Sequence, residues 1–210
     1  MSPPPGRTGE RVAVIAALLA LPVSSPSALE ARVAQAAAQE TATQSKPAPS
    51  EATDVTRAEI ESVLAVLGDS IDQQVKVVDV GSDTNVAVGV LHRRAMSSEG
   101  ESIRGLVHHD VTEVYYVLEG SGTLVTGGSL EEARAFPADS AVVTELVGPS
   151  SGGSSRGATS RRISQGDVVI IPAGIFHAFS EIQNEIRYLS IRVDPAQVLP
   201  AGYVHPALRD

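Results

Sequence analysis

The stretch GESIRGLVHHDVTEVYYVLEG, from Gly100 to Gly120, decides the fold. A second stretch, GDVVIIPAGIFH, runs from Gly166 to His177. Together they hold three of the five histidines of the chain, together with Glu113 and glycines at fixed spacing in strand-like sequence. We interpret the two stretches as two halves of one metal site inside a β-barrel.

Alternation along a strand predicts which of these side chains meet. Successive residues of a strand face opposite sides, so Leu106 and His108 share one face, and Glu113 and Tyr115 share a face of the next strand. The residues between His108 and Glu113 are enough for a tight turn, and His177 comes from a later hairpin after a Pro-x-Gly corner. Two imidazoles and one carboxylate then converge, leaving coordination positions open on a divalent metal ion such as iron, manganese, nickel or zinc.

The two stretches resemble the paired motifs of the cupin superfamily. The first motif reads G-x5-H-x-H-x(3,4)-E-x6-G. Gly100, His108, Glu113 and Gly120 keep its spacing, while Leu106 stands where the family has its first histidine. Related cupins usually offer three histidines and one glutamate, so the resemblance implies a ligand set with one histidine fewer.

The second motif of the family reads G-x5-P-x-G-x2-H-x3-N. Its positions fall on Gly166, Pro172, Gly174 and His177, with Glu181 in place of the asparagine. The resemblance covers about residues 70 to 195. It implies an all-β fold, a double-stranded β-helix (cupin, or jelly-roll) barrel, and it implies a homodimer.

The first motif can also be read in a second register. His109 lies four residues before Glu113, and Val107 then takes the place of the first histidine. Only the His108 register also puts a glycine, Gly100, at the start of the motif. We favour His108 as the ligand and keep His109 as the alternative, because neighbouring side chains on an unbroken strand face opposite ways.

Three further residues are candidates for the substrate pocket. Tyr115 and Tyr116 face opposite sides of one strand, so one of them is expected to point inward. Tyr188 and Arg192 share a face of the last strand and could line the mouth, where the guanidinium would hold an anionic substrate. The pocket candidates are therefore Tyr115, Tyr188 and Arg192, with structural packing and exposed strand charge as the alternatives.

The chain before the barrel divides into segments of different composition. Residues 1–36 contain two arginines, then an apolar run and small residues, the order typical of a secretory signal peptide. The run is too short to span a bilayer as a helix, and an Ala-rich disordered tail is the alternative. Residues 37–55 are predicted to be a flexible linker, and the protein to be periplasmic or secreted.

A short amphipathic helix is expected within residues 56–68. Thr56 and Glu59 form a capping box, apolar residues recur at helical spacing over 57–67, and Gly68 stands where the helix should end. The barrel is expected to occupy residues 69–197, and 198–210 to form a C-terminal tail.

From Gln74 onward the hydrophobic period changes to two, which predicts an antiparallel sandwich or barrel. A Ser/Gly-rich segment, Gly148–Ser160, is predicted to be a flexible surface loop. The strand-like runs are 75–80, 85–92, 103–109, 113–118, 122–126, 141–146, 167–172, 176–182 and 186–193.

Composition limits the classes of function. The 210 residues carry a formal net charge of −9, which argues against nucleic acid or an anionic membrane as a partner. The absence of cysteine excludes disulfides and thiolate ligands. We therefore expect a metal-dependent enzyme acting on a small organic molecule, of oxygenase, isomerase or lyase type. The alternative is a non-enzymatic cupin that binds a small ligand or metal.

Overall fold

The computed structural model describes residues 49–98 and 103–209. The predicted signal peptide, most of the predicted linker and Gly100 lie outside these residues. No helix in the described part of the chain combines the length and apolar character needed to cross a membrane.

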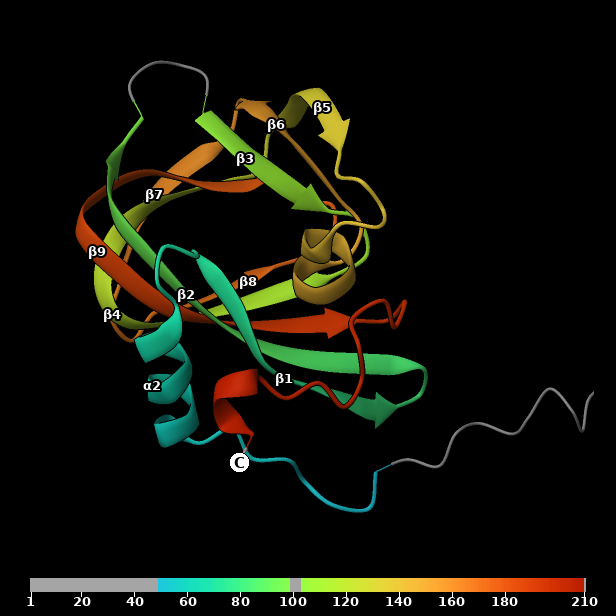
Figure 1. Cartoon of the computed structure of the whole chain (residues 1–210). Coiled ribbons are helices and arrows are strands. Elements are labelled where there is room, and N and C mark those ends of the chain that lie inside the picture. Colours follow the sequence, from blue (N-terminus) through green and yellow to red (C-terminus); the bar gives the residue numbers. More distant parts are fainter. Residues whose placement is uncertain (1–48, 99–102, 210) are drawn as a thin grey trace, which may run out of the picture. The chain divides into compact units, whose positions relative to one another are not determined.

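In the described part of the chain, nine strands, paired antiparallel, form the barrel (Figure 1). They are β1 (Asp72–Gly81), β2 (Thr84–Ser97), β3 (Ile103–His108), β4 (Thr112–Thr126), β5 (Ser129–Ala135), β6 (Ser150–Arg156), β7 (Thr159–Ser164), β8 (Val168–Ile171) and β9 (His177–Asp194). The long β9 pairs with β2 and β4 and, at its start, with β3, while β4 also pairs with β7 and β8. The expected all-β architecture is confirmed.

Alternating burial separates the inside of the barrel from the outside. On β4, Glu113, Tyr115 and Val117 are buried, whereas Tyr116 is exposed. Interior side chains of β4 and β9, with others from β2, β7 and β8, form the main hydrophobic cluster, which includes Leu124. The polar side chains discussed below lie beside this cluster.

The predicted helix is present as α2 (Arg57–Val66) and begins with the expected capping box. Its buried residue Val63 packs with Val75 and Val90 on the outer face of β1 and β2. The tail also lies against β1: Leu199 is buried with Val77, and the short 3₁₀ helix η2 (Pro206–Leu208) follows near α2.

The prediction of a strand at 141–146 is wrong, since this segment forms the π-helix η1 (Val142–Val147). Val143 and Val147 are four residues apart and both buried, so they lie on one helical face. The helix ends at Gly148, whose φ is 69°. Burial of one helical face outweighs the extended preference of these β-branched residues.

The prediction of a loop at Gly148–Ser160 is also wrong, because most of this segment is β6 and the start of β7. Gly153 permits close strand packing: a Cβ there would lie 2.5 Å from the carbonyl oxygen of Glu131 and 2.8 Å from Leu130 Cδ1. Antiparallel pairing with β3 places Ser150 opposite His108. The small residues therefore serve close approach of strands, which composition alone cannot distinguish from flexibility.

Candidate metal centre

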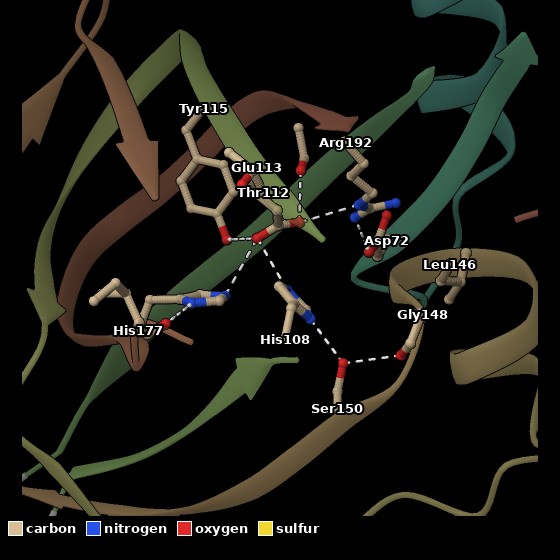
Figure 2. A network of polar contacts seen from close by, with 12 residues as sticks. Asp72, His108, Thr112, Glu113, Tyr115, Leu146, Gly148, Ser150, His177 and Arg192 are labelled. Carbon is tan, nitrogen blue, oxygen red and sulfur yellow. Dashed lines mark hydrogen bonds and ion pairs between the residues drawn. The ribbon is translucent and has the colours of Figure 1, made fainter. Parts of the chain in front are cut away.

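Three side chains from three strands meet inside the barrel (Figure 2). His108 stands at the end of β3, Glu113 near the start of β4 and His177 at the start of β9. Glu113 Oε2 lies 3.1 Å from His108 Nε2 and 3.2 Å from His177 Nε2. One ligand atom from each residue lies within 4.8 Å of the other two, and all three side chains are buried. The sequence motifs thus bring together the three residues that they single out.

The outer nitrogen of each imidazole has its own partner. His108 Nδ1 lies 2.8 Å from Ser150 Oγ, and this hydroxyl in turn donates to the carbonyl oxygen of Gly148 at 2.9 Å. Ser150 has only one hydroxyl proton, so it must accept from His108 Nδ1–H. His177 Nδ1 lies 3.1 Å from the carbonyl oxygen of Ile175, which can only accept.

These contacts fix the tautomer of both rings. With the proton held on Nδ1, a neutral imidazole presents an unprotonated Nε2, the form that binds metals. Two Nε2 lone pairs then face the Glu113 carboxylate oxygen across about 3 Å. Lone pairs at that separation repel unless a proton or a cation lies between them, so the donor set fits a divalent metal ion.

Hydrogen bonds also orient the Glu113 carboxylate. Oε1 accepts from Ser190 Oγ at 2.7 Å and from Arg192 Nε at 3.0 Å, and Oε2 accepts from the Tyr115 hydroxyl at 3.0 Å. Arg192 also forms an ion pair with Asp72. Every partner of this carboxylate therefore comes from the inward faces of the strands, which leaves it little freedom to rotate.

The protonation states suit a cation site. Burial lowers the pKa of the His108 imidazole against the opposing effect of the Glu113 carboxylate, so the ring is neutral near pH 7. Burial alone would raise the pKa of Glu113. Contacts with the two imidazoles and the charge on Arg192 outweigh it and hold that pKa well below its ordinary value. The permanent charge on Arg192 is the main reason for the low pKa of Glu113. The imidazoles cannot donate hydrogen bonds to this carboxylate while their protons are on Nδ1.

A cavity of about 380 Å³ lies beside the three ligands. Its volume is at the lower end of the range for small-molecule sites. The polar part of the lining includes Arg93 and Arg104, and the apolar part includes Leu106, Phe136 and Phe179. This arrangement can admit a small molecule to the open side of a bound ion.

The other candidate residues occupy different places. His109 is exposed, and its Nε2 lies 2.9 Å from Ser151 Oγ on the outer side of the sheet, away from Glu113. Tyr115 lines the cavity. Tyr188 belongs to the hydrophobic core and is not in the cavity lining. Arg192 does line the cavity, but it is fully buried and ion-paired and is not part of an exposed mouth.

Sequence reasoning missed several contributors to the centre. Ser190 was overlooked although it lies between Tyr188 and Arg192 on the same strand face, so the period-two pattern could have identified it. Ser150 lies in a segment whose Ser/Gly composition predicts a loop, so it is not among the predicted site residues. Asp72 carries no local signal, since it meets Arg192 only through the pairing of β1, β2 and β9.

A family model described as Cupin matches residues 74–205, more than half of the chain. The chain belongs to the cupin family. No curated protein matched this cupin in a separate search.

Comparison with solved structures gave matches of low identity. The match to BH2720 from Bacillus halodurans is 17% identical, with a TM-score of 0.41, and covers 74% of this cupin and 90% of that chain. A protein with a double-stranded β-helix domain from Klebsiella pneumoniae is 16% identical with a TM-score of 0.33, over 62% and 83% of the two chains. An oxalate decarboxylase is 17% identical with a TM-score of 0.36, over 60% of this cupin and only 25% of that chain.

Proposed function

We propose that this cupin binds one divalent transition metal ion through His108, Glu113 and His177 and acts on a small organic molecule in the adjacent cavity. The observation that carries the proposal is the pair of contacts at the two Nδ1 atoms, from which the tautomer of each imidazole follows. Ser150 and the Ile175 carbonyl hold both protons on Nδ1, so the Nε2 atoms converge on the carboxylate as electron-pair donors.

The residues around the ligands would have separate tasks. Ser190 and Arg192 hold Glu113 by its Oε1 atom and keep it ionised, which leaves Oε2 directed at the imidazoles. Tyr115 donates a hydrogen bond at that oxygen, and burial raises the pKa of its phenol well above the ordinary value, so it remains a donor. A bound ion would supply Lewis acidity at its open coordination positions.

The ligand set favours one class of reaction but does not identify the reaction. Two histidines and one carboxylate are the set of non-haem iron oxygenases, so iron is the first metal to test, followed by manganese, nickel and zinc. Isomerase and lyase chemistry use the same fold, and fold does not decide function. The alternative is a non-enzymatic protein that holds a small ligand or a metal ion in this cavity.

Metal content tests the proposal directly. The purified full chain would be analysed by plasma mass spectrometry beside His108→Ala, His177→Ala and the matched control His109→Ala. We expect close to one ion per chain in the wild type and in His109→Ala, and loss of the ion in the other two variants. Equal metal content in all four proteins, or none after reconstitution, would contradict the proposal.

Turnover separates the enzyme from the binding protein. If the cupin is an enzyme, conversion of a substrate should disappear in His177→Ala while the fold, followed by circular dichroism, stays intact. Binding of the same molecule that is unchanged after metal removal, with no conversion, favours the non-enzymatic alternative.

We also propose that the cupin forms a homodimer through the outer face of β4 and β8. Val168, Ile170 and Tyr116 are exposed there by 60%, 68% and 42%, and Tyr116 lies directly opposite Val168 in the strand register. Apolar side chains that adjoin on a sheet face are typical of contact surfaces.

Export by residues 1–36, to a periplasm or out of the cell, is part of the same proposal and rests on the order of charge, apolar run and small residues.

A further inference from the structure

The cavity beside the metal ligands contains two arginines that the metal centre does not use. Arg93 lies on β2 and Arg104 on β3, and both line the cavity. We propose that these two arginines bind the carboxylate of the substrate, and that the substrate is a small acid with an apolar body. The inference rests on the proposed function, because it names the substrate class of the same cavity.

Arg93 is held in place by contacts that leave one edge of its guanidinium open. Its Nε donates to the Tyr188 hydroxyl at 3.0 Å, and its guanidinium carbon lies 5.6 Å from the centroid of the Phe179 ring. Within the described part of the chain, neither terminal nitrogen of Arg93 has a hydrogen-bond or ion-pair partner. Two parallel N–H groups in a fixed plane match the two oxygens of a carboxylate.

Arg104 lies on the inward face of β3, two residues from Leu106 and four from His108. No acidic group among the described residues pairs with it. Some surface arginines pair with an acidic group, as Arg94 does with Asp69 at 3.1 Å, whereas others such as Arg162 contact only hydroxyl groups in the segments that the structure describes. An arginine that lines a cavity without a counter-ion is available to a ligand.

The cavity is positive although the protein is acidic. Its lining carries Arg93, Arg104 and Arg192 against Asp72 and Glu113, so one positive charge is in excess before any metal binds. A divalent ion would increase that excess, whereas the chain as a whole carries −9. A cleft with a net positive charge attracts ligands of negative charge.

The remaining lining is apolar and would receive the body of the acid. Leu91, Leu124 and Phe179 come from β2, β4 and β9, and Leu106 and Phe136 also line the cavity. Burial of apolar ligand surface contributes about 25 cal/mol per Å². A short hydrophilic acid would therefore lose most of the binding energy that the cavity offers, and an uncharged molecule would lose the arginine contacts.

The test uses three probes that separate the contribution of the carboxylate from that of the apolar ring. They are phenylacetate, its neutral isostere phenylacetamide, and acetate. Binding to the purified full chain would be measured by isothermal titration calorimetry. We expect phenylacetate to bind at least about tenfold more tightly than either other probe, because a hydrogen-bonded charge pair or a buried ring is each worth at least that factor. Equal binding of phenylacetate and phenylacetamide overturns the inference.

Variants then assign the effect to the two arginines. Arg104→Gln changes an exposed side chain and should keep the fold. Arg93→Gln should lose more affinity for phenylacetate, because the guanidinium of Arg93 is held in a fixed orientation by Tyr188 and Phe179. Arg93→Lys keeps the charge without the planar fork and should recover only part of the loss. Arg94→Gln, next to Arg93 but facing outward, is the matched control and should bind phenylacetate as the wild type does. Phenylacetate binding unchanged in both Arg93→Gln and Arg104→Gln contradicts the assignment.

The two proposals fail in distinguishable ways. Metal content is measured on the same samples, and the titration is repeated with His177→Ala. A protein without metal that still prefers phenylacetate through its arginines supports the substrate class and contradicts the metal site. A protein that holds metal but does not distinguish phenylacetate from phenylacetamide keeps the metal site and overturns the substrate class.

Discussion

Ser150 should control metal affinity without touching the metal. Its hydroxyl is the only acceptor for His108 Nδ1–H among the described residues, and it is 1% exposed. Ser150→Ala removes that acceptor and leaves a buried N–H unpaired, a loss of about 1–3 kcal/mol. Loss of a hydrogen-bond partner behind a metal-ligating histidine typically costs roughly 10–100-fold in metal affinity, which is about 1.4–2.8 kcal/mol. The two estimates agree, so the dissociation constant should rise by roughly that factor.

The neighbouring serine provides the control. Ser151 faces outward and contacts the exposed His109 at 2.9 Å, so Ser151→Ala makes the same change on the other face of β6. Such surface changes stay within about 0.5 kcal/mol, so its affinity should stay within roughly twofold of the wild type. Metal affinity would be measured by competition with a chelator, with thermal unfolding as a check on the fold. Equal affinity of Ser150→Ala and Ser151→Ala would refute the tautomer argument.

Three other predictions concern pH, assembly and processing. The pKa values of His108 and Glu113 lie below their ordinary values of 6.5 and 4.5, so the unfolded chain binds more protons. These two groups should therefore contribute fully to the free energy of unfolding of the chelator-treated protein above pH 6.5. Urea titrations at lower pH should show that contribution decreasing, first as His108 and then as Glu113 becomes protonated. Val168→Lys with Ile170→Lys should convert a dimer to a monomer in analytical ultracentrifugation; an unchanged mass would place the interface elsewhere. Removal of residues 1–36 should leave a folded protein, and N-terminal sequencing of the exported form should find them absent; their retention there contradicts the signal peptide.

Spacing within single strands made the ligands predictable. His108, Glu113 and His177 each lie at a fixed spacing from a glycine of the two motifs, and alternation along a strand predicts which side chains share a face. Alternation alone leaves His108 and His109 as alternatives, since only one of two neighbours can face inward, and the spacing from Gly100 favours His108. Local sequence is therefore sufficient to predict the three candidate metal ligands.

Contacts that depend on strand pairing were not predictable. Ser150 meets His108 because β6 lies beside β3, and Asp72 meets Arg192 because β1 and β9 flank β2. Neither pairing leaves a local pattern, and the Ser/Gly composition around Ser150 favoured a loop. The face that Arg192 shares with Tyr188 predicts a place at the mouth of the pocket, with an exposed strand charge as the alternative. The burial of Arg192 is understood only once both of its carboxylate partners are known.

Leu106 connects the metal centre with the cavity. It stands where the cupin motif has its first histidine, shares the inward face of β3 with His108, and lies opposite His177 in the register of β3 and β9. A histidine there would add a ligand on the side of the cavity; leucine presents apolar surface to it. Coordination positions not taken by the three ligands would therefore face the space that the apolar body of an acid would fill. If the proposed metal and substrate both bind, the residue that replaces one histidine ligand also shapes the substrate site, and we expect metal binding and substrate binding to be linked through Leu106.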